Sequence, residues 1–111
     1  MVVREFVVRP GCERDFAIIF GSGGVWCGLL QRYAPGFLVS ELVAMGDRRY
    51  RVRDYWTSHL EFEAFRDWRQ DEVEQFRDWL ASKEMVERET VLGSFYLDDS
   101  DWDEGAGLVS A

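Results

Sequence analysis

The feature that most constrains the fold is a strand that is apolar on both of its faces. Residues 37–45 read FLVSELVAM, and only Ser40 and Glu41 interrupt the apolar pattern. A sheet with one face in water normally alternates apolar and polar residues, so this strand predicts cover on both sides of its sheet. Helices of the same chain can cover one face. For the other face we predict a second copy of the chain, packed sheet against sheet in a homodimer.

The residues before this strand predict one strand and two helices. Val2–Val8 is rich in β-branched and aromatic residues, with Arg4 and Glu5 interrupting the apolar run, and Pro10-Gly11 stops it. Apolar residues then recur at helical spacing in two stretches, separated by a glycine-rich break. The two stripes are Phe16, Ile19 and Phe20, followed by Trp26, Leu29, Leu30 and Tyr33.

A hairpin is predicted directly after the apolar strand. Gly46 and Asp47 mark a turn, and Arg49–Trp56 (RYRVRDYW) reads as the next strand. Because side chains alternate across a strand, this one presents two different faces. Arg51, Arg53 and Tyr55 share one face, whereas Tyr50, Val52, Asp54 and Trp56 share the other.

A long helix and a last strand complete the domain. Ser58 and Glu61 have the spacing of a capping box, which predicts a helix that begins near His59. Its apolar stripe continues to Leu80, with a bend near residues 70–71. Residues 86–97 (VERETVLGSFYL) read as the last strand, with a bulge or close contact at its glycine.

The order strand, helix pair, strand, strand, long helix, strand predicts a ferredoxin-like βαββαβ domain. This is an α+β fold with a four-stranded antiparallel sheet and helices on one face. A chain of 111 residues is long enough for one such domain, which we place at residues 1–97. Residues 98–111 contain five acidic residues and no basic residue, and we expect them to form a flexible acidic tail.

Charge and cysteine content exclude several functional classes. The net charge is −8 and no basic surface is concentrated in the sequence, so neither nucleic acid nor an anionic membrane is an expected partner. No apolar run approaches the length of a membrane span, and no signal-peptide pattern opens the chain. Cys12 and Cys27 lack the spacing of a metal or redox motif, so we expect free thiols in a cytoplasmic protein.

Six short motifs occur in an order and spacing that are typical of a known family. They are RPG at 9–11, RYAPGF at 32–37, EL at 41–42, DYW at 54–56, EFEAF at 61–65 and LGSF at 92–95. Over about residues 2–97 the chain resembles the antibiotic-biosynthesis-monooxygenase (ABM) domains of the dimeric α/β-barrel superfamily. The resemblance implies a homodimer in which two sheets form a shared barrel, with a pocket between each sheet and its helices.

The resemblance also implies a range of activities. Members of the family oxygenate polycyclic phenols without metal or flavin, degrade haem, or process quinols or small aldehydes. Haem degradation relies on an Asn, a Trp and a His, whereas this chain has no Asn and carries Phe65 and Gln75 near the other two positions. We therefore expect a cofactor-independent monooxygenase that acts on an aromatic or polycyclic phenolic small molecule. Its substrate would be deprotonated to an anion that itself reduces dioxygen.

Six residues are the candidates for this chemistry. His59 is the only histidine, and histidine exchanges protons near neutral pH, so it is the candidate base unless it is simply solvated at the helix start. Arg53 can stabilise the anionic oxygen; the alternative is a cross-strand ion pair with Glu41 or Glu5. The candidate substrate-binding walls are Trp26, Tyr33, Trp56 and Phe65, of which Trp56 can instead be a core residue between strand and helix.

Two other functions fit the same sequence. One is a non-catalytic homodimeric domain that binds a small ligand or serves as an accessory module. The other is a non-oxidative cyclase or isomerase on the same barrel, which would use the same base without oxygen. Convergence of His59 and Arg53 on an enclosed cavity would favour an enzyme, and their exposure to bulk water would favour a binding domain.

Overall fold

The computed structural model describes residues 1–95, within which the chain forms four strands and four helices. The acidic tail expected at residues 98–111 lies outside the described residues. The elements are β1 (Val2–Val8), α1 (Glu13–Phe20), α2 (Val25–Tyr33), β2 (Phe37–Gly46), β3 (Arg49–Trp56), α3 (His59–Trp68), α4 (Gln70–Ser82) and β4 (Val86–Ser94).

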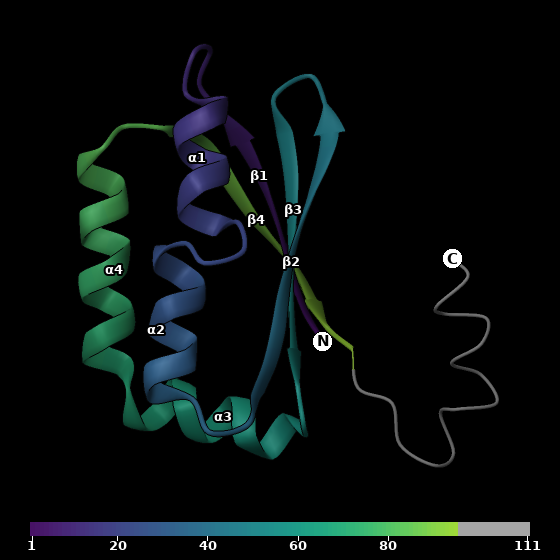
Figure 1. Ribbon diagram of the computed structural model, residues 1–111, viewed down its shortest axis with the longest axis vertical. Coiled ribbons are helices and arrows are strands. Elements are labelled where there is room, and N and C mark those ends of the chain that lie inside the picture. Colours follow the sequence, from purple (N-terminus) through teal and green to yellow (C-terminus); the bar gives the residue numbers. More distant parts are fainter. Residues whose placement is uncertain (96–111) are drawn as a thin grey trace, which may run out of the picture.

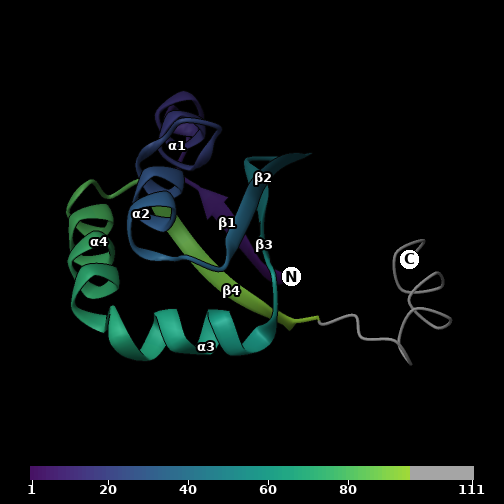
Figure 2. The ribbon, with the colours of Figure 1, turned by 60° about the horizontal axis from the view of Figure 1, so that its bottom comes forward.

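The strands form one antiparallel sheet in the order β2-β3-β1-β4, so β2 and β4 are the edge strands. Figure 1 shows the helices gathered on one side of the twisted sheet. In Figure 2, α3 runs across one end of the sheet while α4 stands beside it. This arrangement is the ferredoxin-like α+β fold that the order of elements predicts.

The core lies between the sheet and the helices and consists largely of aromatic rings. Phe6 of β1 and Phe16 and Phe20 of α1 are fully buried, with ring centroids between 4.7 Å and 5.1 Å apart. Helical spacing of the apolar residues directs each helix stripe inward, as predicted. The same cluster also includes Val2, Val8, Ile19, Trp26, Leu30, Ala34, Val52, Trp56, Phe65, Phe76, Leu80 and Met85.

The long helix predicted after β3 is in fact two helices that meet at Arg69. Arg69 has φ −119° and ψ 30°, which ends α3 and precedes α4, one residue before the predicted bend. Its guanidinium lies 5.0 Å from the ring centre of Tyr33, and its Nη1 lies 3.4 Å from a carboxylate oxygen of Glu72. The apolar stripe continues through the break, so periodicity alone could not locate it.

The start of α3 is held closely against the sheet. The backbone N–H of Glu61 donates to the Oγ of Ser58 at 3.2 Å, which confirms the predicted helix cap. The backbone N–H of Thr57 donates to the carbonyl oxygen of Gly36 at 2.8 Å. A side-chain carbon at Gly36 would overlap the Cβ of Glu61, so only glycine allows β2 to begin this close to α3.

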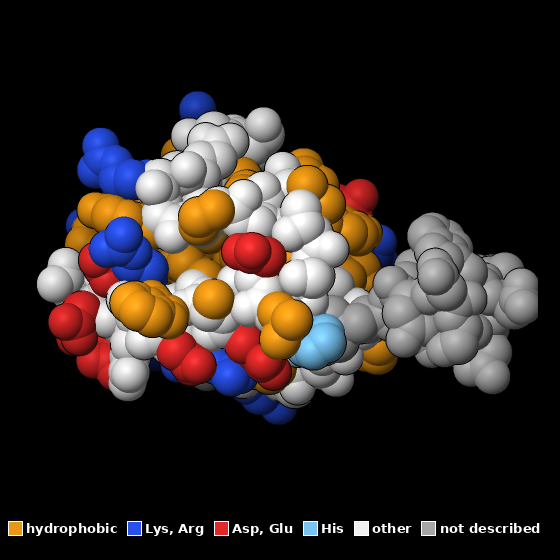
Figure 3. All heavy atoms as spheres, turned by 90° about the horizontal axis from the view of Figure 1, so that it is seen from below, with side chains coloured by type: hydrophobic (Ala, Val, Ile, Leu, Met, Phe, Trp, Pro, Cys, Tyr) orange, Lys and Arg blue, Asp and Glu red, His pale blue; other side chains and the backbone are white. Residues whose placement is uncertain are grey.

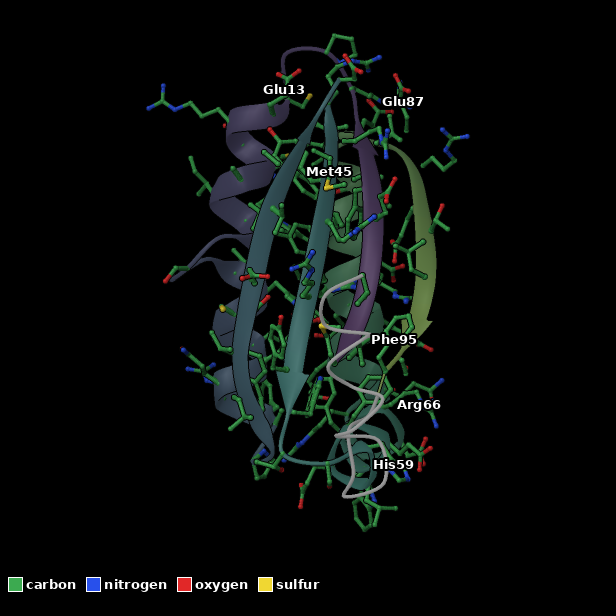
Figure 4. The ribbon with its side chains drawn as sticks, turned by 90° about the vertical axis from the view of Figure 1, so that its right-hand side faces the viewer. Glu13, Met45, His59, Arg66, Glu87 and Phe95 are labelled. Carbon is green, nitrogen blue, oxygen red and sulfur yellow. The ribbon has the colours of Figure 1, made fainter. Side chains whose placement is uncertain are left out.

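The outer face of the sheet is covered by no helix or strand within residues 1–95, as Figure 4 shows. On β2, Val39 of this face is 54% exposed. Arg53 donates to Glu41 at 2.9 Å, and Arg51 donates to Glu5 at 3.2 Å. The strand β2 is therefore apolar on this face apart from Glu41, as predicted, but its neighbours contribute paired charges.

Smaller predictions can be checked in the same residues. Cys12 and Cys27 are both free thiols, as expected. A register shift between β1 and β4 occurs beside Gly93, which has φ 142°, and this confirms the predicted irregularity. Within residues 1–95, no helix has both the length and the apolar character needed to cross a membrane.

Candidate functional site

A cavity of about 490 Å³ lies between the inner face of the sheet and the helices α2, α3 and α4. This volume is within the usual range of small-molecule sites. Side chains from the first and last strands and from the elements between them contribute to the lining. They are Val2, Arg4, Trp26, Asp54, Trp56, Phe62, Phe65, Arg66, Asp67, Gln70, Val73, Glu74, Phe76, Arg77 and Val91.

The turn at Arg69 shapes this cavity. Because α3 crosses the end of the sheet and α4 runs beside it, the two helices form two adjoining walls (Figure 2). The inner face of β1 and β3 forms a third wall. Trp26 enters from α2, and Val91 of the edge strand β4 lies at the border.

Aromatic rings make up most of the apolar part of the wall. The ring of Trp56 lies 5.4 Å, centre to centre, from both Phe62 and Phe65 of α3. The ring of Trp26 lies 5.0 Å from Phe76 of α4. Trp56 is only 8% exposed, so it is at once a core residue and a wall of the cavity. The two interpretations offered for it by the sequence are both satisfied.

Asp54 occupies the polar inner end of the cavity, where it is 3% exposed. The indole N–H of Trp26 donates to its two carboxylate oxygens at 3.2 Å and 3.1 Å. The hydroxyl of Ser40 donates to Oδ1 at 2.6 Å, and Nη2 of Arg4 donates to Oδ2 at 3.5 Å. Each oxygen of this buried carboxylate therefore accepts two hydrogen bonds.

Arg4 is the second buried charge of the cavity. Its guanidinium carbon lies 4.6 Å from the ring centre of Trp26 and 5.4 Å from that of Phe6, in cation–π geometry. Its Nη1 lies 3.7 Å from Glu89. Arg4 is a residue of the cavity that was not predicted from the sequence. The alternation of side chains along the strand could have identified it, because Arg4 shares the inner face of β1 with Val2, Phe6 and Val8.

Arg53 does not line this cavity. It lies on the outer face of β3, where its Nη1 donates to Glu41 at 2.9 Å. The alternative of a cross-strand ion pair with Glu41 is therefore confirmed, and Arg53 as an anion stabiliser in this cavity is not supported. The physical reason is the strand period of two, which turns Arg53 away when Asp54 and Val52 turn inward.

His59 does not line the cavity either. It is the exposed first residue of α3, and Figure 4 places it beyond the end of the strands. Figure 3 shows its imidazole on the outer surface of the α3 end of the molecule. The structure therefore does not bring His59 and Arg53 together. The helix start that makes His59 attractive to an anion also places it outside the cavity.

Three of the four aromatic residues predicted to bind substrate line the cavity, and one does not. Trp26, Trp56 and Phe65 line the cavity, whereas Tyr33 does not. Tyr33 ends α2 and is half-buried beneath the guanidinium of Arg69. Through this contact, Tyr33 packs against the residue that joins α3 and α4. Within residues 1–95, no group of three or more His, Cys, Asp or Glu side chains is arranged to hold a metal ion.

No protein-family model matches this chain, and no curated protein matches it significantly. Among solved structures, the crystal structure of PA3566 from Pseudomonas aeruginosa is similar, with a TM-score of 0.56 and 11% sequence identity. The match covers 87% of this chain and 92% of that chain. A likeness at this identity concerns the fold alone, and it agrees with the ferredoxin-like arrangement described above.

Proposed function

We propose that this chain is a homodimeric domain that binds a flat aromatic small molecule in the cavity between its sheet and helices. The observation that carries the proposal is the composition of the wall. Five aromatic side chains surround a volume of about 490 Å³, and polar groups are confined to the inner end and the border. Protein sites for small ligands commonly combine an apolar wall with a few placed polar groups. The five rings belong to Trp26, Trp56, Phe62, Phe65 and Phe76.

The ring geometry suits a planar ligand. Offset or edge-on aromatic pairs contribute roughly 0.5–1.5 kcal/mol each beyond the area that they bury. A ligand of two or three fused rings can contact the indoles of Trp26 and Trp56 and the rings of α3 and α4 together. An aliphatic ligand of the same volume would lose these contacts, so we expect aromatic ligands to bind more tightly.

The homodimer is proposed from the outer face of the sheet. This face exposes Val39 and other apolar side chains of β2, and no helix within residues 1–95 covers it. The charges of this face on β1, β2 and β3 are already paired within the chain, Arg53 with Glu41 and both Arg51 and Arg49 with Glu5. Charges that keep their partners cost less to cover than isolated ones. A second copy of the same sheet is our proposed cover.

Nuclear magnetic resonance of the ¹⁵N-labelled full chain tests the binding proposal. Two- and three-ring aromatic molecules should produce saturable shifts of the indole signals of Trp26 and Trp56. The indole signal of Trp68, which is 85% exposed and outside the cavity, should not shift.

A pair of variants tests the location of the ligand. Val73→Trp fills the cavity and should weaken binding at least tenfold, about 1.4 kcal/mol. Leu60→Trp adds the same side chain outside the cavity and should leave affinity unchanged. Absence of saturable shifts with all such ligands would exclude the proposal.

A second candidate function is the cofactor-independent monooxygenase implied by the family resemblance, and the position of Arg4 favours it. A buried guanidinium beside an aromatic chamber can stabilise a phenolate or enolate oxygen. That anion would reduce dioxygen; an anthrone, for example, would consume one O₂ and yield the quinone and one water. Because no histidine lines the cavity, this candidate requires a substrate that ionises readily without His59 as its base.

Oxygen uptake separates the two candidates. With an anthrone, the monooxygenase predicts protein-dependent consumption of oxygen in equal amount to the quinone formed. Arg4→Lys should lower that rate, because lysine cannot present the planar pair of donors that arginine does. Uptake that does not exceed the protein-free rate, together with binding of the same molecule, would leave the binding function alone.

A further inference from the structure

At the buried inner end of the cavity, the side chain with unused hydrogen-bonding groups is Arg4, and these groups are donors. We infer that the cavity recognises an oxygen acceptor attached to the aromatic plane of its ligand, and that Arg4 holds this oxygen at the inner end. The ligand class is therefore an aryl ketone, phenolate or carboxylate rather than an aryl amine or a hydrocarbon. This inference rests on the proposed function and names the chemistry that the same site selects.

Arg4 is held in position before any ligand arrives. Its side chain is 9% exposed, and its guanidinium carbon lies 4.6 Å from the ring centre of Trp26 and 5.8 Å from that of Phe20. These contacts hold the guanidinium among the rings of the core. A ligand oxygen would thus meet a donor that needs no further ordering.

Most of the hydrogen-bonding capacity of Arg4 is unused. A guanidinium carries five N–H donors. Within residues 1–95 its single hydrogen bond joins Nη2 to Asp54 at 3.5 Å, and the oxygen of Glu89 is 3.7 Å from Nη1, beyond hydrogen-bond distance. Because Arg4 lines the cavity, the remaining donors are accessible from it.

Asp54 offers no free hydrogen-bond acceptor to a ligand. Its oxygens already accept from Trp26, Ser40 and Arg4, so a ligand donor would have to displace one of these bonds. The indole N–H of Trp56 also has no acceptor, but its nitrogen is buried and a ligand in the cavity does not reach it. The available groups at the inner end are therefore the donors of Arg4.

Charge at the border of the cavity does not make this selection. The border carries Arg66 and Arg77 together with Asp67 and Glu74, two charges of each sign. A ligand is therefore not attracted or rejected there by its net charge. The discrimination lies at the buried end, where an unpaired donor and a matching oxygen are both removed from water.

Three ligands of nearly equal shape test the inference with the unaltered full chain: 2-naphthoate, 2-acetylnaphthalene and 2-isopropenylnaphthalene. The first offers an anionic oxygen, the second a neutral carbonyl and the third no oxygen. We expect both oxygen-bearing ligands to bind at least about tenfold more tightly than the hydrocarbon, as measured by calorimetry. A preference for the carboxylate alone would narrow the class to anions.

Equal affinities for the three ligands would overturn the inference and leave the proposed function standing. Failure of all three to bind would overturn both. Arg4→Lys preserves the charge opposite Asp54 and should reduce the preference, and Arg66→Lys at the border is its matched control and should not. Trp56→Phe removes an indole N–H that the ligand does not reach and should leave the preference unchanged, and the three ligands with the unaltered chain decide the inference even if Arg4→Lys fails to fold.

Discussion

The indole N–H of Trp26 is shared between the two carboxylate oxygens of Asp54, at 3.2 Å and 3.1 Å, and this bond joins α2 to β3 inside the domain. The indole N–H of Trp56, in the same cavity wall, is buried without a partner. Both tryptophans are less than a tenth exposed. They therefore form a matched pair that differs in the hydrogen bond of the indole.

Replacing each tryptophan with phenylalanine should affect stability unequally. Trp26→Phe leaves the buried carboxylate of Asp54 with fewer donors, whereas Trp56→Phe removes a donor that has no acceptor. We expect Trp26→Phe to lower the free energy of unfolding by about 1–3 kcal/mol more than Trp56→Phe does. Urea unfolding of both variants measures the difference. Equal losses would show that the bond to Asp54 contributes no net stability.

Two glycines should respond in opposite directions to alanine. Gly36→Ala places a methyl group against the Cβ of Glu61, so α3 must move away from the sheet, at a cost of about 1–3 kcal/mol. Gly28 lies within α2 with no atom near its missing side chain. Gly28→Ala should stabilise the domain by about 0.5–1 kcal/mol. Thermal unfolding midpoints that move in the same direction would contradict the packing described at Gly36.

Acid should weaken the outer face of the sheet through Glu5. The hydrogen bond from Arg51, with a further contribution from Arg49, holds the pKa of Glu5 below its ordinary value of 4.5. Because the folded-state pKa is lower than the unfolded one, ionised Glu5 stabilises the fold above about pH 4.5, and this contribution is lost as the pH falls through the folded-state pKa.

Glu5→Gln should therefore flatten the acid side of the stability profile. Urea midpoints recorded from about pH 7 to about pH 3 measure it. Glu63→Gln is the control for loss of one negative charge, since Glu63 makes no ion pair within residues 1–95. The same slope in the Glu5 and Glu63 variants would remove Glu5 from the explanation.

The proposed dimer predicts a concentration-dependent mass. Sedimentation should give twice the 13.0 kDa of one chain, and Val39→Glu on the outer face of β2 should shift the equilibrium towards single chains. Ile18→Glu is the matched control, because Ile18 is similarly exposed, at 62%, but lies on α1. A single-chain mass for the unaltered protein at all concentrations would exclude the dimer.

The fold was largely predictable because the residues that start and end its helices and strands act locally. Pro10-Gly11 and Gly46-Asp47 end strands, and the Ser58 cap starts α3, each through chemistry confined to a few residues. The break at Arg69 was placed less well. It depends on where Tyr33 and the end of the sheet lie in space, and the spacing of apolar residues along a helix carries no information about such tertiary contacts.

The candidate site was only partly predictable. Aromatic residues on predicted inner faces, such as Trp26 and Phe65, do line the cavity. His59 and Arg53 were selected for the chemistry of their side chains, and their positions in the fold turned both away. Arg4 was not among the candidates, although it interrupts the apolar run of its strand. Its burial depends on Trp26 and Asp54, which lie far from it in the sequence and near it only in the fold.

The corner at Arg69 has a consequence for the range of molecules that the cavity can admit. Only one residue separates α3 from α4, so the two walls cannot spread apart independently, as walls joined by a long loop could. The angle between these two walls is therefore set by the backbone at this joint. Inserting a residue or two at this joint is the change that would let the two helices separate and the cavity bind larger ligands.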